Sequence, residues 1–477
     1  MSNEFLEPSS ENGGLHRSLS NRHLQLIAIG GAIGTGLFMG SGKTISLAGP
    51  SILFIYGLIG IMVFFVMRAL GELLLSNLNY KSFIDLSTDL IGPWAGYFVG
   101  WTYWLCWVTI GIADLSAIIY YLEFFNGGES FTPMGGLLIS TVAILFVLGL
   151  NLVTVKLFGE MEFWLAIIKV VAIIAMIAFG SYLLASGSGH SQSSLQNLWQ
   201  LGGFFPNGIT GLVMAMAMIM FAFGGIELVG IAAAETDNPQ KTLPKAVNQI
   251  VYRVLLFYIL SLVVILSLYP WNMMAEGGSP FVLIFDSLGS QTVAAVLNFV
   301  VLTAAVSVYN STNYCTSRML LGLAQQGNAP KFLSKINPRG IPVNAIMVSA
   351  FFTLICVLIN YLFPEKAFNL LMMLVVAAIV INWVVISYTH LKFKKAMNRM
   401  QVKTHFPSVA YPFTNYLCIA FMASILLIMS RSPDMQIAVL MIPVWIAILL
   451  TAYLFKRKQE DHVALLEKSK ITSLPEA

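Results

Sequence analysis

Charged residues are scarce in this chain. Only 10% of its 477 residues are Asp, Glu, Lys or Arg, while 57% are hydrophobic. A soluble protein of this length could not cover its surface with so few polar side chains. The net charge is only +4, and the basic residues flank apolar runs, which argues against a nucleic-acid-binding protein. The composition predicts a polytopic membrane protein.

Patterns that indicate metal sites or disulfides are missing too. The four cysteines lie in apolar runs without a CxxC motif, so we interpret them as packing residues. The six histidines lie mostly in loops or at the ends of apolar runs, unpaired with cysteines or acids at metal-ligand spacing. We therefore expect no metal, no cofactor and no catalytic residues, which argues against an enzyme. The first two dozen residues are polar, so we expect no cleavable signal peptide.

The hydrophobic residues gather in twelve runs, each long enough to cross a bilayer. The runs lie near residues 24–44, 50–75, 94–122, 135–155, 162–186, 208–235, 250–270, 293–323, 343–363, 367–390, 410–430 and 436–455. Lys and Arg gather in the two terminal segments and in every second connection, while the other connections are nearly bare of them. The positive-inside rule then places both termini in the cytoplasm, which requires an even number of spans.

Two of these runs are interrupted by glycine. The segment Gly30–Gly36 holds four glycines in seven residues, and Phe221–Gly230 holds three. A broken helix exposes backbone groups that the membrane tolerates only where they line a cavity, and the start of the second half-helix directs amides toward an anion. Two interrupted spans at matching positions point to the substrate site of a transporter. The alternative is that the glycines only allow close helix packing.

The two interruptions also suggest how the chain is divided. Spans 1–5 and 6–10 would be inverted repeats, at about 22–187 and 205–391, followed by two extra helices at about 410–456. The transmembrane domain then covers 22–456. We expect a disordered cytoplasmic tail at 1–21 and a second cytoplasmic tail at 457–477.

Five motifs are specific enough to indicate a family. They are Arg22–Phe38, Met67–Glu72, Phe158–Trp164, Gly225–Gly230 and Ser317–Leu320. With them the chain resembles an amino-acid permease of the amino acid–polyamine–organocation superfamily, in its bacterial amino-acid transporter branch. The resemblance covers nearly the whole chain. It implies an all-α LeuT-type fold with twelve transmembrane helices, and proton-coupled amino-acid uptake by alternating access at the bacterial inner membrane.

The resemblance also implies a substrate site at the two interruptions. Amides around Thr35 and Gly36 would bind the substrate carboxylate, and carbonyls near Ala32 and in Phe221–Gly224 would bind its ammonium group. Phe221 matches an aromatic gate over the substrate, whereas Phe223 is equally well a packing residue. The expected substrate-binding residues are Ala32, Ile33, Gly34, Thr35, Gly36, Phe221, Phe223, Gly224 and Gly225.

Two ionisable residues within the spans are expected to couple transport to protons. Lys169 is the one charged residue of the run Phe163–Phe179, and a charge at this depth costs about 2.5–3.5 kcal/mol on insertion scales. Proton-coupled relatives carry a lysine on this fifth span where sodium binds in sodium-coupled ones; the alternative is a side chain that reaches the interface. Glu227 matches a glutamate that the family uses to link substrate and gate, or it caps unwound amides.

Other polar residues in the spans have open interpretations. Ser307, Asn310 and Ser311 share one face of the eighth span; they line the pocket or the lysine site, or they form interhelical hydrogen bonds. Trp107 in the third span is a further pocket-lining candidate. Asp114, in the same span, requires a partner that the sequence does not identify.

Four charged residues lie near the ends of spans. We expect the pair Glu72 and Arg68, and the pair Glu160 and Glu162, to form cytoplasmic gate contacts or helix-end charges.

Different parts of the chain resemble permeases for different amino acids. Met39–Ser46 and Gly100–Trp107 resemble D-serine/D-alanine/glycine permeases, while Met220–Gly225, Ser307–Ser311 and Val375–Ile386 resemble aromatic amino-acid permeases. Gly224 stands where the small-substrate permeases carry valine, and a missing side chain leaves room for a larger substrate. We therefore favour aromatic or bulky neutral amino acids. The alternatives are small neutral amino acids, or an exchanger of the same fold.

The expected partners are the amino acid, the proton and the lipid bilayer, with no nucleic acid.

Overall fold

A computed structural model describes residues 19–77, 80, 82–188, 192–236, 238–274, 279–282, 291–362 and 364–472. Within these residues the regular structure is helical, apart from one isolated bridge between Leu19 and Thr236. Ten helical segments of this part of the chain are long and apolar enough to cross a membrane. This confirms an all-helical polytopic membrane protein. Most of the predicted tail 1–21 lies outside the described residues.

The first half of the chain begins with an interrupted helix. Its helices are α1 (Asn21–Ala32), α2 (Thr35–Phe38), α3 (Gly40–Ala48), the 3₁₀ turn η1 (Gly49–Ser51), α4 (Ile52–Ser76), α5 (Phe83–Leu90), α6 (Pro93–Phe125), α7 (Pro133–Asn151) and α8 (Val155–Ser186). Several starts have clear local causes. Ser82 and Asp85 form a capping box at α5, and the Thr154 hydroxyl accepts a hydrogen bond from the Leu157 amide at α8.

The second half contains the second interruption. It consists of η2 (Leu195–Leu198), α9 (Gly208–Ile219), η3 (Met220–Phe223), α10 (Leu228–Ala233), α11 (Pro239–Asn248), α12 (Ile250–Arg253), the π-helical turn η4 (Val254–Leu260), α13 (Ser261–Leu268), η5 (Trp271–Met273), α15 (Gln291–Gln325), η6 (Lys331–Ser334), α16 (Val343–Leu362), α17 (Pro364–Met400), α18 (Phe413–Arg431) and α19 (Gln436–Thr472). The segments α11 to α13 follow one another as a single apolar stretch, Pro239–Leu268.

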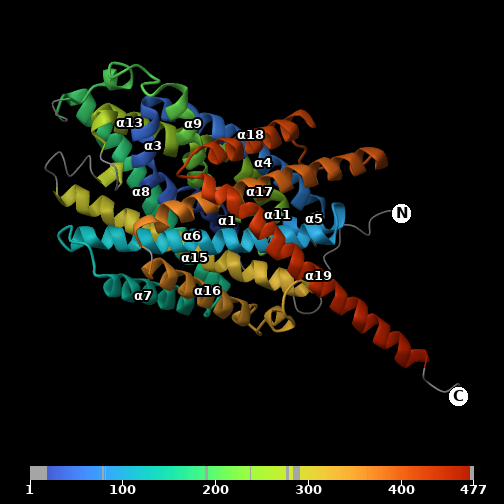
Figure 1. Cartoon of the computed structure of the whole chain (residues 1–477). Helices are drawn as coiled ribbons and strands as arrows, with labels where there is room; N and C mark the ends of the chain where they lie inside the picture. Colours follow the sequence, from blue (N-terminus) through green and yellow to red (C-terminus); the bar gives the residue numbers. More distant parts are fainter. Residues whose placement is uncertain are drawn as a thin grey trace.

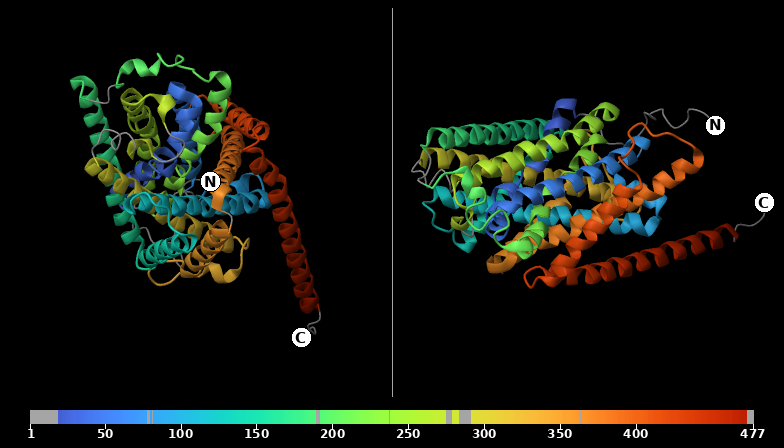
Figure 2. Two further views of the ribbon diagram at one scale, coloured as in Figure 1. Left: turned by 60° about the vertical axis from the view of Figure 1, so that its left-hand side comes forward. Right: turned by 90° about the horizontal axis from the view of Figure 1, so that it is seen from above.

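Two long helices, α6 and α15, run side by side through the bundle (Figure 1). The first helix α1 contacts α8, α10 and α15, while α2 contacts η3 and α3 contacts α9. The interrupted segments are therefore surrounded by other helices. The outer helix α19 extends past the rest of the bundle (Figure 2). We call the end of the bundle where α1 begins and α19 ends the α1 end.

Candidate functional site

The first interruption lies at Ile33 and Gly34. The helix α1 continues through Gly30 and ends at Ala32, so the break is narrower than the glycine-rich segment suggested. Gly34 is extended, with φ −120° and ψ −169°, and α2 starts at Thr35. The first amides of a helix have no acceptor within it. The amides of Thr35 and Gly36 therefore point out of the start of α2, as the sequence predicted.

The second interruption covers Met220 to Glu227. A 3₁₀ turn ends at Phe223, a turn with Gly225 at φ +92° follows, and the helix resumes at Leu228. A positive φ favours glycine because it has no Cβ. Two carbonyls of this segment already have partners: Phe221 O accepts from the Gly224 amide (3.1 Å), and Ala222 O accepts from the Tyr258 hydroxyl (3.0 Å).

The two interruptions contact each other through backbone. A Cβ added at Gly36 would lie 2.5 Å from Ala222 Cα and 3.1 Å from the Phe221 ring. Real Cβ atoms do not approach that closely, so only glycine fits at this point. The sequence predicted the two breaks separately, and the structure brings them together.

The aromatic residues predicted to lie at the substrate site have different surroundings. Phe221 lies against Gly36 and so at the contact between the breaks. Phe223 stacks on Tyr258 at 5.1 Å between ring centroids and also contacts Tyr56, which fits the packing interpretation. Trp107 contacts the Tyr103 ring edge-on.

Gly224 does not leave open space. A Cβ there would lie 2.7 Å from Ile379 Cδ1, so a side chain of α17 fills the room that we expected the missing side chain to provide. The argument for a larger substrate from Gly224 alone is therefore not supported by the packing.

Asp114 obtains its partner from the first interruption. Thr35 Oγ1 donates a hydrogen bond to Asp114 Oδ1 (2.7 Å), and the carboxylate is fully buried on α6. Its Oδ2 has no hydrogen-bond partner in the described chain. The Thr35 hydroxyl is thus directed to Asp114, while the Thr35 amide is the group expected to bind the substrate. Nothing in the spacing of the two residues along the sequence could have revealed this contact.

Lys169 lies in a buried polar network. Its Nζ donates to the Gly30 carbonyl (2.9 Å) and to Ser307 Oγ (3.0 Å). The Ser307 hydroxyl donates to Glu162 Oε2 (2.7 Å), and Asn310 Nδ2 donates to Oε1 of the same carboxylate (2.8 Å). Lys169 and Glu162 are therefore joined through a serine hydroxyl and form no direct ion pair in the described chain.

Lys169 also closes the C-terminal end of α1. The Gly30 carbonyl is among the last four of that helix, which have no amide partners within it. A positive charge beside these carbonyls is favourable because they form the negative end of the helix dipole. The side chain is 0% exposed, so it points into the bundle and does not reach toward the interface.

Glu162 differs from its expected role as a gate or helix-end charge. Its side chain is buried within the Lys169 network. Glu162 lies seven residues before Lys169, which is two helical turns and places both on one face of α8. That spacing is the signal the sequence reasoning missed. Glu160, by contrast, pairs with Arg22 and with His23 Nε2 (3.0 Å) at the α1 end.

Glu227 lies after the second interruption, beside three polar groups. Its carboxylate faces the Tyr103 hydroxyl, the Trp383 indole and the Gly225 amide. None of these contacts meets hydrogen-bond geometry, so both carboxylate oxygens lack a partner in the described residues, although the side chain is buried. Such an arrangement is compatible with capping of the unwound segment and with the linking role that the family resemblance implies.

The α1 end is closed by a second charged cluster. Arg318 Nε donates to Glu235 Oε1 (2.8 Å), and its Nη2 lies 3.4 Å from Oε2. The Tyr314 hydroxyl donates to the same carboxylate (2.8 Å), and the Tyr314 ring stacks on Phe158 at 4.1 Å. All four side chains are buried. This cluster joins α8, α15 and the end of α10.

Glu72 and Arg68 fasten the α17–α18 connection and do not pair directly with each other in the described structure. The buried Glu72 carboxylate binds His390 Nε2 (2.8 Å) and Lys394 Nζ (2.8 Å). The Arg68 guanidinium lies 3.7 Å from the centre of the Phe406 ring. Of the two expected roles, gate contacts or helix-end charges, the structure fits the second, because both residues lie near the end of α4 and bind the connection at Thr404, Pro407 and Ser408.

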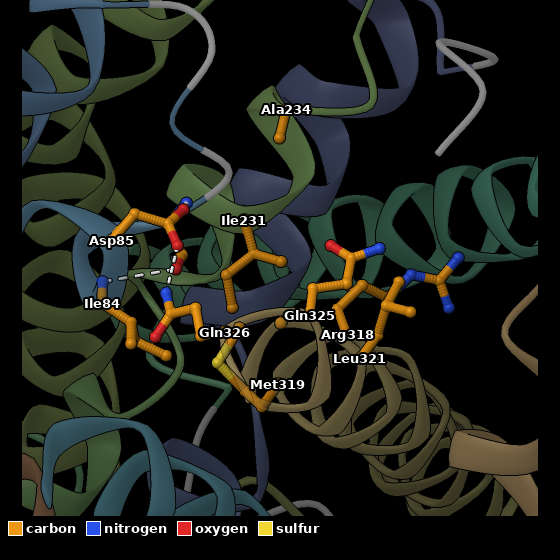
Figure 3. A pocket seen from close by; sticks show the side chains of 11 residues that line it. Ile84, Asp85, Ile231, Ala234, Arg318, Met319, Leu321, Gln325 and Gln326 are labelled. Carbon is orange, nitrogen blue, oxygen red and sulfur yellow. Dashed lines mark hydrogen bonds between the residues drawn. The ribbon is translucent and has the colours of Figure 1, made fainter. Parts of the chain in front are cut away.

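A cavity of about 230 Å³ lies beside Arg318 at the α1 end. Figure 3 shows it between α5, α10 and α15, with Ile231 pointing into it and a hydrogen bond from Gln326 to Asp85 at one edge. It is displaced from the contact between the two interruptions. Its lining residues are Ser82, Ile84, Asp85, Ile231, Ala234, Arg318, Met319, Leu321, Gly322, Gln325 and Gln326.

The chain is similar to known transport proteins over nearly all of its length. It is 53% identical over 444 residues to the aromatic amino acid transport protein AroP of Escherichia coli (strain K12), which covers 93% of this chain and 96% of that protein. It is 53% identical over 445 residues to AroP of Salmonella typhimurium (strain LT2), with the same coverage. It is 46% identical over 449 residues to the uncharacterized transporter YdgF of Bacillus subtilis (strain 168), covering 94% and 97%.

A family model described as amino acid permease matches residues 23–464. Together with the 53% identity to the aromatic amino acid transport proteins, this match shows that the chain belongs to the amino acid permease family.

Proposed function

We propose that this permease is a proton-coupled symporter that imports aromatic or other bulky neutral amino acids across the bacterial inner membrane. The observation that carries the proposal is the direct contact of the two interruptions at Gly36 and Ala222. The amides of Thr35 and Gly36 beside this contact have no acceptor within α2, so the breaks would supply peptide groups that bind a zwitterion without any charged side chain.

The substrate carboxylate would bind the amides at the start of α2. Those of Thr35 and Gly36 lack helical acceptors, and the positive end of the helix dipole favours an anion. The ammonium group would bind carbonyls near Ala32 and Phe223, and the Thr35 hydroxyl, bound to Asp114, would hold the start of α2 in place. Phe221 would cover the bound substrate.

The fold we propose has twelve spans in two inverted repeats of five, plus α18 and α19. Ten spans correspond to the long apolar segments, one of which, Gly208–Ala233, contains the second interruption; the remaining two would be α1–α2, which leads into α3, and the shorter α16. The breaks at Gly34 and at Met220–Glu227 would occupy matching positions in the repeats. Both termini would be cytoplasmic by the distribution of Lys and Arg, which makes the α1 end the cytoplasmic end.

Proton coupling would depend on Lys169 and, at the second interruption, on Glu227. Ionisable groups buried in a membrane are expensive and serve function by default. Loss of the Lys169 proton would weaken its bond to the Gly30 carbonyl and so free the end of α1 to move. The closed cluster at Arg318 and Glu235 would then be the cytoplasmic gate of an outward-facing or occluded conformation.

The choice of substrate is supported by the 53% identity to proteins named for aromatic amino acid transport. Two alternative functions predict different transport results. A small-substrate permease would transport D-alanine and glycine in preference to phenylalanine, and an exchanger would require amino acid inside the vesicle.

The test is transport by the purified protein in proteoliposomes. We expect labelled phenylalanine to accumulate when the outside is made acidic, and unlabelled tyrosine and tryptophan to compete with it more strongly than D-alanine or glycine. Uptake that ignores the proton gradient but requires internal amino acid would overturn the symport proposal. Stronger competition by D-alanine would overturn the choice of substrate.

A further inference from the structure

We propose that Glu162 is the group that receives the proton from Lys169, through the Ser307 hydroxyl, on its way to the α1 end. This inference rests on the proposed proton coupling and adds a second proton-binding site to it. Two contacts carry it, Lys169 Nζ to Ser307 Oγ (3.0 Å) and Ser307 Oγ to Glu162 Oε2 (2.7 Å), together with the absence of a direct ion pair between the two charges in the described chain.

The hydrogen bonds that connect Lys169, Ser307 and Glu162 all run in one direction, from the amine to the carboxylate. Ser307 accepts from the ammonium group with its oxygen and donates its own hydrogen to the carboxylate. In the transfer, an N–H bond of Lys169 breaks as an O–H bond forms at Ser307, and the original Ser307 proton moves to Glu162 Oε2. The products are a neutral amine, a neutral carboxylic acid and an unchanged hydroxyl. No other reactant is needed.

The position of Glu162 sets the direction of transfer. It lies seven residues before Lys169 on α8, or about 10 Å closer to the α1 end at 1.5 Å per residue. Asn310 Nδ2 holds the second carboxylate oxygen (2.8 Å), and Asn151 Nδ2 holds Asn310 Oδ1 (2.7 Å). These amides fix the carboxylate in place but cannot take the proton from it.

An aromatic pair separates Glu162 from the α1 end. Phe158 lies one turn before Glu162 on α8, Tyr314 lies one turn after Asn310 on α15, and their rings stack in parallel at 4.1 Å. The Tyr314 hydroxyl is bound to Glu235, the partner of Arg318. Tyr314 therefore links the aromatic pair to the gate, and a gate movement that shifts α15 relative to α8 would separate the stacked rings and admit water to Glu162. Proton release would be tied to gate opening in this way.

The titratable surroundings of Glu162 are few. Lys169 is on its own helix, Cys315 approaches from α15, and Asp114 approaches Lys169 from α6. Ser311 of α15 also faces the carboxylate. The only cation among the groups that approach this carboxylate in the described structure is Lys169, which makes the two residues a natural proton donor and acceptor.

The test compares gradient-driven uptake with counterflow in proteoliposomes. Counterflow needs substrate binding and gate movement but no net proton transfer. We expect Glu162→Gln and Ser307→Ala to reduce gradient-driven phenylalanine uptake by about 100-fold, the lower range for a positioned proton-transfer group, while counterflow is retained. Glu129→Gln in the exposed α6–α7 connection and Ser424→Ala on exposed α18 are the matched controls and should behave as the wild type.

Two results would overturn the inference. One is gradient-driven uptake by Glu162→Gln equal to that of the wild type. The other is loss of counterflow together with uptake in a folded Glu162→Gln protein, because the role would then be structural. Should that variant not fold, Ser307→Ala decides by the same two measurements. If uptake by the wild type does not respond to the proton gradient, the proposed symport is wrong. If uptake by the wild type and by Glu162→Gln responds equally to the gradient, symport stands and only this inference is wrong.

A second measurement reports the proton directly. The infrared difference spectrum of the wild type between acidic and alkaline pH should contain the carbonyl stretch of a buried protonated carboxyl group, and Glu162→Gln should remove it. Persistence of that band unchanged in the variant would contradict proton binding at Glu162.

Discussion

Two buried acid–base clusters in this permease are built differently. At the α1 end, Arg318 and Glu235 touch directly through two nitrogen–oxygen contacts, of 2.8 and 3.4 Å. Deeper in the bundle, Lys169 and Glu162 are separated by the Ser307 hydroxyl. Both clusters are shielded from solvent, so burial does not explain the difference.

The chemistry of the two cations explains it. A guanidinium group stays protonated in proteins and forms two-point contacts with a carboxylate, which suits a latch that opens and closes without changing charge. A lysine amine can lose its proton, and a bridging hydroxyl gives that proton a route. The comparison therefore supports the two proposed roles, a gate for Arg318 and Glu235 and a coupling site for Lys169 and Glu162, by the type of cation and the way it contacts its acid.

The largest effect is expected at the coupling site. Lys169→Ala should abolish gradient-driven accumulation because the amine that carries the proton is gone, while substrate binding to the purified protein remains measurable. Uptake under an imposed proton gradient and binding by isothermal titration check this. Unchanged accumulation would remove Lys169 from the coupling mechanism and with it the contrast between the clusters.

The largest loss of stability is expected when the buried pair of Arg318 and Glu235 is broken. Arg318→Ala leaves the buried Glu235 carboxylate without its cation, and breaking a buried pair in this way costs about 3–5 kcal/mol. Thermal unfolding in detergent should show a clearly lowered transition temperature. The double variant Arg318→Met with Glu235→Leu, which removes both charges, should recover most of the loss; if it is as unstable as the single variant, the pair is not what stabilises this end.

A smaller loss of stability is expected at Ser307. In Ser307→Ala, Lys169 keeps its bond to Gly30 and Glu162 keeps its bond to Asn310, so each charge loses only one partner. A buried group left short of a hydrogen bond costs about 1–3 kcal/mol. Thermal unfolding of Ser307→Ala and Arg318→Ala, measured side by side, should show the smaller loss of stability in Ser307→Ala. The reverse order would contradict the contrast between the two clusters.

The smallest effect is expected for the exposed pair at the start of α1. Arg22 is 57% exposed and pairs with Glu160, and surface pairs of this kind contribute little because water and salt screen them. Arg22→Gln should unfold at nearly the wild-type temperature. A loss comparable to that of Arg318→Ala would mean that the α1 end is closed mainly by surface charge.

The sequence was informative where a local pattern has one physical meaning. Four glycines in an apolar run predicted the break that the structure has at Gly34, and the lone charge at 169 predicted a lysine inside the bundle, where the side chain is buried. It was less informative where the meaning depends on a distant partner. The Thr35–Asp114 bond joins residues 79 apart, and Ser307 reaches Glu162 across 145 positions.

One expectation failed because a neighbour was unknown. The absence of a side chain at Gly224 suggested free volume, but Ile379 of α17 occupies it. Packing density makes this the ordinary outcome in a folded core, since space left by one residue is usually filled by another. Volume arguments from a single sequence position therefore need the residues that face it.

The close contact between Gly36 and Ala222 has a consequence for how the substrate preference of such a permease can change. The centre of the molecule is made of peptide groups common to every residue, and an alanine at position 36 would push the two halves apart. A different substrate can therefore not be selected by a substitution at this contact itself. In the proposed site, preference would be set by side chains beside this contact, such as Phe221 at Gly36 and Ile379 at Gly224, while the peptide groups that bind the zwitterion stay the same.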